Sequence, residues 1–323
     1  MGALSVSQFV DLMVGGLAVG CVYSLIALGF AMIMRATNII HFAQGEVMML
    51  GCMCGLTSVW LLPVLPLLAV VAVGMASSGI IAVAMELAVY RTLRRRRVPI
   101  MNLITATVGM SILCINAARI VWGSEPLRFP ELFVTTAYEF GGVRVSPQLF
   151  WIMVMGVVIM AALQLFLKHT RTGLAMQAMA QDSEAAQLMG ANLTRMMAYT
   201  FAISGMMAGA AGIMLGSMFF AFFEMGFITG LKGFVAATLG GIGSITGAML
   251  GGILFGLIET FSTVFLSSAY KDGIGMILLI AILLVFPSGL VGLWQKRRGA
   301  PRSTQARGGA QRYTPSRCWL WPR

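Results

Sequence analysis

The hydrophobic residues of this chain run in long blocks that are separated by short polar segments. Eight blocks can be traced, at residues 9–34, 46–62, 64–90, 100–122, 149–167, 197–222, 228–266 and 274–293. Most are close to the roughly 20 apolar residues that an α-helix needs to cross a bilayer. They do not alternate polar with apolar residues at the period of two that a membrane β-barrel requires. The pattern predicts an all-α, polytopic bundle of transmembrane helices.

The seventh block is longer than one crossing needs. Gly240, Gly241, Gly243 and Gly247 interrupt its middle, and glycines there favour a turn or a close approach of two helices. We expect two helices joined tightly, with these glycines serving helix packing or a hinge. The bundle then has eight or nine spans, and nine is the preferred number.

Basic residues predict which connections face the cytoplasm, because short loops rich in Lys and Arg stay on that side. Arg91 and residues 94–97 mark one such loop, and Lys168, Arg171 and Arg195 bracket another. Residues 123–147, with three prolines and three glutamates, are expected outside the cytoplasm as a loop. Nine crossings then place the N-terminus outside.

Composition and charge agree with a membrane protein that has a short basic tail. The chain is 59% hydrophobic and 10% charged, with a mean hydropathy of +0.89, far from the usage of soluble domains. The formal charge is +11, and eight basic residues without any acid lie in residues 296–323. We expect residues 1–295 to form the transmembrane domain and residues 296–323 a disordered cytoplasmic tail that does not bind nucleic acid.

Several kinds of chemistry find no support in the sequence. None of the four lysines is preceded by Gly or followed by Ser or Thr, so there is no P-loop. The five cysteines are scattered, and the two histidines, His41 and His169, lie far apart, which argues against a metal site. No nucleophile, base and orienting acid occur together. We therefore expect no enzyme activity and no cofactor, and any ATP must be bound by another subunit.

Residues 171–195 form a long amphiphilic connection, RTGLAMQAMAQDSEAAQLMGANLTR, where a short loop would suffice. Within it, Glu184, Ala185 and Ala186 are followed by Gly190, which resembles the EAA-x3-G signature of ABC-importer permeases. The resemblance implies that residues 173–190 form a cytoplasmic helix that docks on the ATPase. Alanines would let it seat closely, Glu184 would offer a charge, and Gly190 would end it. A simple surface helix is the alternative.

Two further segments resemble those of branched-chain amino-acid permeases, and the resemblance is to the H-type subunit. Residues 38–46 read NIIHFAQGE and residues 239–247 read LGGIGSITG, similar to the NxxxFAxGE and LGGxGSxxG segments of that family. The likeness extends from about Gly15 to Gly292. It implies an inner-membrane permease that imports aliphatic amino acids with a second, homologous permease, two ATPases that bind ATP and Mg, and an external solute-binding protein. Gln44 stands where many relatives have His, which leaves the exact substrate open. Urea or short amides are the nearest alternative substrates, because related permeases share these motifs.

Acids inside the predicted spans are candidates for the translocation pathway, because an unpaired carboxylate in hydrocarbon costs several kcal/mol. Glu46 lies at an expected helix start, with Asn38, His41 and Gln44 supplying nearby polar groups. The alternative is that it only caps a broken helix. Glu259 is either a gate or an interhelical hydrogen-bonding group. If these acids held a coupling ion, the chain would instead be an ion-driven secondary transporter.

Overall fold

The computed structural model describes residues 6–129, 138–140, 143–241 and 243–266, with scattered positions between 273 and 289. Residues 296–323, the predicted tail, lie outside the described residues, as does most of the predicted last span at 274–293. In chain order the elements are α1 (Val6–Thr37), α2 (Gln44–Leu61), α3 (Leu67–Met85), the π-helical turn η1 (Glu86–Tyr90), α4 (Arg91–Arg95), α5 (Ile100–Trp122), β1 (Tyr138–Phe140), β2 (Val143–Val145), α6 (Pro147–His169), α7 (Arg171–Gln181), α8 (Ser183–Leu188), α9 (Leu193–Met218), α10 (Met225–Gly240) and α11 (Ile245–Leu266).

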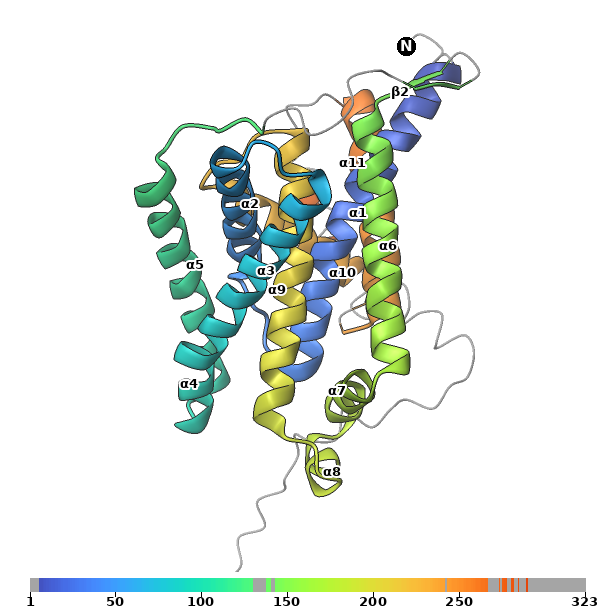
Figure 1. Cartoon of the computed structure of the whole chain (residues 1–323). Helices are drawn as coiled ribbons and strands as arrows, with labels where there is room; N and C mark the ends of the chain where they lie inside the picture. Colours follow the sequence, from blue (N-terminus) through green and yellow to red (C-terminus); the bar gives the residue numbers. More distant parts are fainter. Residues whose placement is uncertain are drawn as a thin grey trace, which may run out of the picture.

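The predicted all-α transmembrane bundle is confirmed (Figure 1). Within the described ranges, six helices are long and apolar enough to cross a membrane, and α10 is a shorter apolar helix. The long ones are α1, the continuous run of α3 to α4, α5, α6, α9 and α11. With α2, α10 and the largely undescribed last block, the number of apolar helices is close to the eight or nine predicted.

Helix α1 lies at the centre of the bundle, and α5 and α6 lie at its edge. In its most apolar window α1 is 89% buried, whereas the corresponding windows of α5 and α6 are 22% buried. Helix α1 packs on α9, α10, α11 and α6, so it is surrounded by protein. The exposed side chains of α5 are mostly apolar, as expected where the surrounding medium is lipid or another membrane subunit.

Helices α2 and α10 begin inside the bundle instead of at its ends. The side chain of Gln44, the first residue of α2, hydrogen-bonds to Ser204, which lies near the middle of α9. The first turn of α10 packs against the same end of α2, where Gly226 and Gly45 touch backbone to backbone. Two of the predicted spans are therefore shorter helices, and hydropathy alone does not distinguish these from full crossings.

The two ends of the bundle carry different segments (Figure 1). Helices α4, α7 and α8 lie at one end, and the β1–β2 hairpin lies at the other, near the N-terminus. The strands pair antiparallel, with Glu139 opposite Arg144; sequence reasoning treated this region as loop. Both predicted cytoplasmic connections are thus at the same end, opposite the described part of residues 123–147.

The connection predicted as a basic loop after the third block is largely helical. Helix α3 passes through the π-helical turn Glu86–Tyr90 into α4, which ends at Arg95. The prediction of a loop starting at Arg91 was wrong, because long arginine side chains can follow a helix out of the apolar region while their charged groups reach water.

The predicted division of the seventh block is confirmed, because α10 ends at Gly240 and α11 begins at Ile245. Gly241 and Gly243 have φ values of 112° and 79°, which side chains other than glycine rarely adopt. Gly240 and Gly247 touch so closely that a Cβ on either would overlap the backbone of the other. These four glycines build a tight turn between packed helices. A hinge motion at this turn stays a prediction.

Candidate functional site

The polar residues predicted at the α1–α2 connection separate into a surface residue and three buried ones. Asn38 is exposed and follows α1 with a φ of 55°, a left-handed conformation that asparagine tolerates better than most residues. It therefore turns the chain and does not join the buried group. His41, Gln44 and Glu46 are each at most 2% exposed, and each faces a different neighbour.

Gln44 joins α2 to α9. Its amide nitrogen donates a hydrogen bond to the backbone oxygen of Ser204 at 3.2 Å, and the Ser204 hydroxyl donates to the Gln44 side-chain oxygen at 3.2 Å. Gly29 of α1 faces this amide, and a Cβ at that position would overlap it. The reciprocal pair leaves both side-chain groups satisfied in a buried place, where an unpaired amide would be costly.

Glu46 lies where the first turns of α2 and α10 meet. The Ser111 hydroxyl of α5 donates to its Oε1 atom at 3.1 Å, while Oε2 has no hydrogen-bond partner among the described residues and lies against Gly226. No side chain makes a capping hydrogen bond to α2, and the choice between a pathway role and stabilisation of the helix start stays a prediction for Glu46. The N-terminal ends of two helices carry partial positive charge that favours a carboxylate between them.

The meeting of α2 and α10 depends on glycine at both helix starts. A Cβ on Gly45 would overlap the backbone oxygen of Gly226, and Gly230 lies against Gly45 as well. Sequence reasoning missed Gly226 and Gly230. The signal was present, because Phe42-Ala-Gln-Gly45 and Phe223-Glu-Met-Gly226 place glycine three residues after phenylalanine at the start of each short helix.

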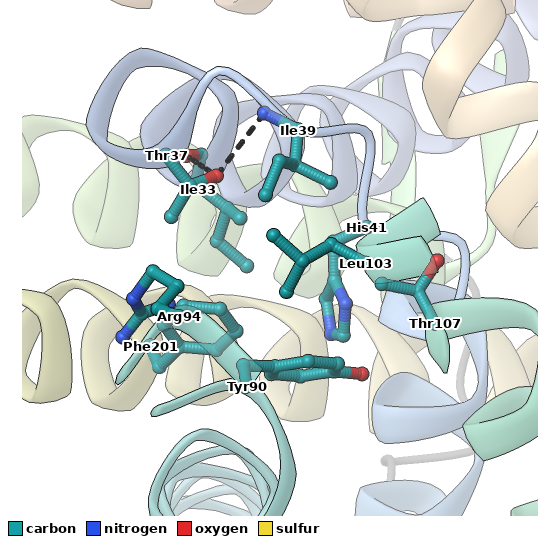
Figure 2. A pocket seen from close by; sticks show the side chains of 9 residues that line it. All are labelled: Ile33, Thr37, Ile39, His41, Tyr90, Arg94, Leu103, Thr107 and Phe201. Carbon is teal, nitrogen blue, oxygen red and sulfur yellow. Dashed lines mark hydrogen bonds between the residues drawn. The ribbon is translucent and has the colours of Figure 1, made fainter. Parts of the chain in front are cut away.

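His41 is part of an aromatic cluster with Tyr90 of η1 and Phe201 of α9. The His41 ring centroid lies 5.2 Å from that of Tyr90 and 5.4 Å from that of Phe201, both edge to face. The three rings line a cavity, together with side chains from α1, α4 and α5 (Figure 2). Sequence reasoning identified His41 and missed both of the rings that surround it.

An ion pair closes one side of this region. Glu86, the first residue of the π-helical turn, is fully buried and accepts a hydrogen bond from Arg94 of α4, whose side chain is 26% exposed. Glu86 follows the end of α3. Its partner is Arg94 and not Arg91, which is nearer in the sequence, because the π-helical turn adds residues per turn and changes which side chains share a face.

Glu259 lies apart from the α2 junction and is paired with Lys232. The Lys232 Nζ atom of α10 donates to Glu259 Oε1 of α11 at 2.6 Å, and the two side chains are 7% and 1% exposed. Of the two predicted roles, the structure contains an interhelical contact, which is an ion pair. Sequence reasoning had considered Lys232 only as a residue that lacks a P-loop around it.

The predicted helix at residues 173–190 is two helices. Asp182 separates α7 from α8, and its carboxylate accepts hydrogen bonds from the backbone N–H groups of Glu184 and Ala185, both at 3.0 Å. This is an N-cap, which starts a new helix. The prediction of one continuous helix was therefore wrong, because a strong capping residue interrupts it. Gly190 has a φ of 91° and follows the end of α8, as predicted.

Helix α8 presents apolar side chains away from the bundle. Leu188 and Met189 are 89% and 90% exposed, whereas Ala186 is buried. Glu184 and Ala185 are exposed, so three of the four predicted coupling residues, Gly190 included, are accessible at the tip of this end of the molecule (Figure 1).

Among the described residues, no group of three or more His, Cys, Asp or Glu side chains could hold a metal ion.

Comparison with known proteins gives the family. The family model described as "Branched-chain amino acid transport system / permease component" matches residues 12–283. The high-affinity branched-chain amino acid transport system permease protein LivH of Salmonella typhimurium is 37% identical over 306 residues, covering 88% of this chain and 96% of that protein. The corresponding permease protein BraD of Pseudomonas aeruginosa is 35% identical over 299 residues, with the same coverage. The chain belongs to the permease family of branched-chain amino acid transport systems.

Proposed function

We propose that this chain is the membrane-spanning permease subunit of an ATP-driven importer of branched-chain amino acids, located in the bacterial inner membrane. The observation that carries the proposal is the 37% identity over 88% of the chain to a permease protein of a branched-chain amino acid transport system. The named relatives favour amino acids over urea or short amides. A second homologous permease, two ATPases with ATP and Mg, and an external solute-binding protein complete the proposed assembly.

The α7–α8 segment is the part proposed to couple this chain to an ATPase. Its tip exposes Leu188 and Met189 almost fully, which is unusual for large apolar side chains in water and is typical of a docking surface. Glu184 is exposed beside them and can pair with a basic group on the partner. Closure of the ATPases would then move α7 and α8 against the bundle.

The buried junction of α2, α9, α5 and α10 is the proposed translocation site within this subunit. His41, Gln44 and Glu46 come from six consecutive positions. His41 packs on the Phe201 ring of α9, while Gln44 and Glu46 hydrogen-bond to Ser204 of α9 and Ser111 of α5, so a movement of α9 or α5 would expose a polar group to the pathway. Pairing of Glu259 with Lys232 favours this ATP-driven mechanism over ion-driven transport, because Glu259 already has a cationic partner.

The coupling proposal is tested by replacing Leu188 and Met189 together with serine. The matched control is Val64→Ser, since Val64 is 95% exposed in the α2–α3 connection at the other end of the molecule (Figure 1). Loss of two anchors of more than ~1 kcal/mol each weakens ATPase binding by roughly 30-fold or more.

The readouts are recovery of the ATPases with the tagged chain and ATP-driven leucine uptake in proteoliposomes with the binding protein. Both should fall in the double variant and stay unchanged in the control. Full ATPase recovery and uptake with the double variant would show that α8 is not the coupling element. Leucine uptake that needs an ion gradient and no ATP would overturn the proposed function itself.

A further inference from the structure

Three consecutive arginines connect α4 to α5 at the end of the bundle that also carries α7 and α8. Arg95 is the last residue of α4, and Arg96 and Arg97 follow it before α5 begins at Ile100. All three side chains are exposed, and none forms a hydrogen bond or ion pair with any residue that the structure describes. We call these three residues the arginine turn. Their fifteen N–H donors are free to bind a ligand.

The charge of the arginine turn has no counter-charge close to it in the sequence. No Asp or Glu occurs between residues 87 and 124. The acid just before that range, Glu86, is fully buried and already paired with Arg94. Like charges held on neighbouring residues repel one another, so an anion placed among the three guanidiniums would relieve this repulsion.

The backbone of the arginine turn has the conformation that usually calls for glycine. Arg97 has a φ of 51°. Its N–H group donates to the Arg94 carbonyl at 3.0 Å, and the N–H group of Val98 donates to the Leu93 carbonyl at 3.4 Å. This pair of bonds ends a helix as in a Schellman motif, where glycine is the common residue at the left-handed position. An arginine there places a third guanidinium beside the other two at a cost to the backbone.

The arginine turn lies beside apolar side chains that are also exposed. Ile100 and Met101, in the first turn of α5, are 59% and 71% exposed. Helix α4 and the start of α5 are at one edge of the bundle, away from α7 and α8 (Figure 1). A membrane helix at the edge of its bundle meets lipid, so this surface joins a cationic part to an apolar part where the bilayer surface is expected.

We propose that the arginine turn binds the phosphate group of an anionic phospholipid at the predicted cytoplasmic surface of the membrane. The guanidinium groups bind the phosphate through paired N–H donors, a geometry that arginine provides and lysine does not. The acyl chains of the same lipid lie along Ile100 and Met101. The lipid therefore holds the start of α5 at the membrane surface.

Other anionic partners match this surface less well. Inorganic phosphate or a nucleic acid would use the arginines and leave the adjacent apolar side chains in water. The ATPases are proposed to receive Glu184, which is exposed on α8, and a partner surface that is basic for that purpose would repel the arginine turn. A phospholipid with a negative headgroup matches both the charge and the apolar neighbours.

The test is equilibrium binding of tritiated phosphatidylglycerol to the purified, assembled transporter in mild detergent. One variant carries Arg95→Gln, Arg96→Gln and Arg97→Gln. A basic residue near an anionic lipid contributes a factor of about five, so this triple variant should bind roughly 100-fold more weakly. The matched control carries Lys168→Gln, Arg171→Gln and Arg195→Gln, which removes three exposed basic residues from the same end of the molecule and should bind nearly as well as the unaltered transporter.

Competitors identify the chemistry of the ligand. Unlabelled phosphatidylglycerol should displace the label, whereas phosphatidylcholine, which has the same acyl chains and no net charge, should displace it poorly. Inorganic phosphate should also compete poorly, because it lacks acyl chains. Complete displacement by millimolar phosphate would show that the site takes a free anion, and equal displacement by the two lipids would show that the arginines do not select the headgroup. Either result overturns the proposal.

A single variant separates binding from folding. Arg97→Gly removes one guanidinium and places glycine at a φ that suits it. The variant should unfold at the same or a higher temperature, yet bind phosphatidylglycerol about fivefold more weakly. Unchanged lipid binding by this variant and by the triple glutamine variant would refute the proposed site.

The same preparations test the ATPases as the alternative partner. If the triple glutamine variant lost its ATPases while it kept phosphatidylglycerol, the arginine turn would be a protein-docking surface and the lipid proposal would be wrong. None of these measurements involves transport of a solute. A negative lipid result therefore leaves the proposed function standing, and a failure of leucine uptake leaves the lipid site standing.

Discussion

The ion pair between Lys232 and Glu259 makes a prediction that can be worked out from its burial. It links α10 to α11 at 2.6 Å, with side chains that are 7% and 1% exposed. Glu259→Gln or Lys232→Met removes one charge and keeps the approximate shape of the side chain. Each leaves the other ionisable group buried beside a neutral side chain, which removes the attraction that offsets the cost of burying a charge.

The expected magnitude follows from what remains after each change. Breaking a buried ion pair by removing one member costs ~3–5 kcal/mol, whereas replacing both members with neutral residues of similar volume is often neutral or stabilising. We therefore expect each single variant to lose about 3 kcal/mol of stability or more, and the double variant Lys232→Met with Glu259→Gln to lose less than either. Lys168→Met is the control at an exposed lysine and should change stability by less than ~0.5 kcal/mol.

The assay is a double-mutant cycle on purified protein in detergent, with unfolding followed at equilibrium. If the double variant lost the sum of the two single losses, the residues would not be coupled and the reasoning would be refuted. The charge swap Lys232→Glu with Glu259→Lys tests the gate alternative. A folded swap variant that imports leucine shows that a carboxylate at position 259 is not required for transport.

Two predictions concern glycines. Gly45→Ala should destabilise the protein by ~1–3 kcal/mol, because the added Cβ overlaps the Gly226 backbone. Gly15→Ala is the control and should be neutral or stabilising, because nothing lies within 4 Å of a Cβ at that position. Equal thermal unfolding temperatures of the two variants would contradict this reasoning. Gly190→Ala should lower the free energy of unfolding by ~1–2 kcal/mol, because the residue has a φ of 91°, and it should lower leucine uptake. Gly109→Ala is the control, because nothing lies within 4 Å of a Cβ there, and it should change neither quantity. Unchanged uptake by both variants would argue against a role for the end of α8.

The long helices could be predicted from the sequence because lipid leaves the backbone little choice. A chain in hydrocarbon must satisfy its N–H and C=O groups within itself, so a long apolar block becomes a helix almost regardless of its detailed residues. The division between α10 and α11 was predictable as well, since 39 residues exceed one crossing and the glycines mark the turn. Family motifs located the α2 start and the α7–α8 segment.

The partners of the buried polar residues could not be predicted in the same way. Lys232 and Glu259 are 27 positions apart, and their pairing depends on the turn geometry and on how the two helices rotate against each other. Glu46 meets Ser111, 65 positions away, and no local pattern marks that serine. The π-helical turn has no Pro or Gly to announce it, yet it decides that Arg94 and not Arg91 faces Glu86.

These contacts differ in kind, and the difference indicates which pairs of helices separate more easily. Gly45 and Gly226 touch through backbone atoms, so α2 and α10 cannot slide without a clash and are expected to move as one body. Helix α5 is attached to the α2 start and its preceding loop by the hydroxyls of Ser111 and Thr107, at 3.1 to 3.5 Å, and hydroxyl hydrogen bonds can exchange partners at little net cost. Alternating access that opens along α5 would therefore break these three hydrogen bonds and a fourth, from the Trp122 Nε1 atom of α5 to the Thr57 hydroxyl of α2 at 2.8 Å, whereas opening between α2 and α10 would disrupt close backbone packing. Opening along α5 therefore requires less free energy than opening between α2 and α10. The path that it creates lies between Glu46 and the cavity beside His41.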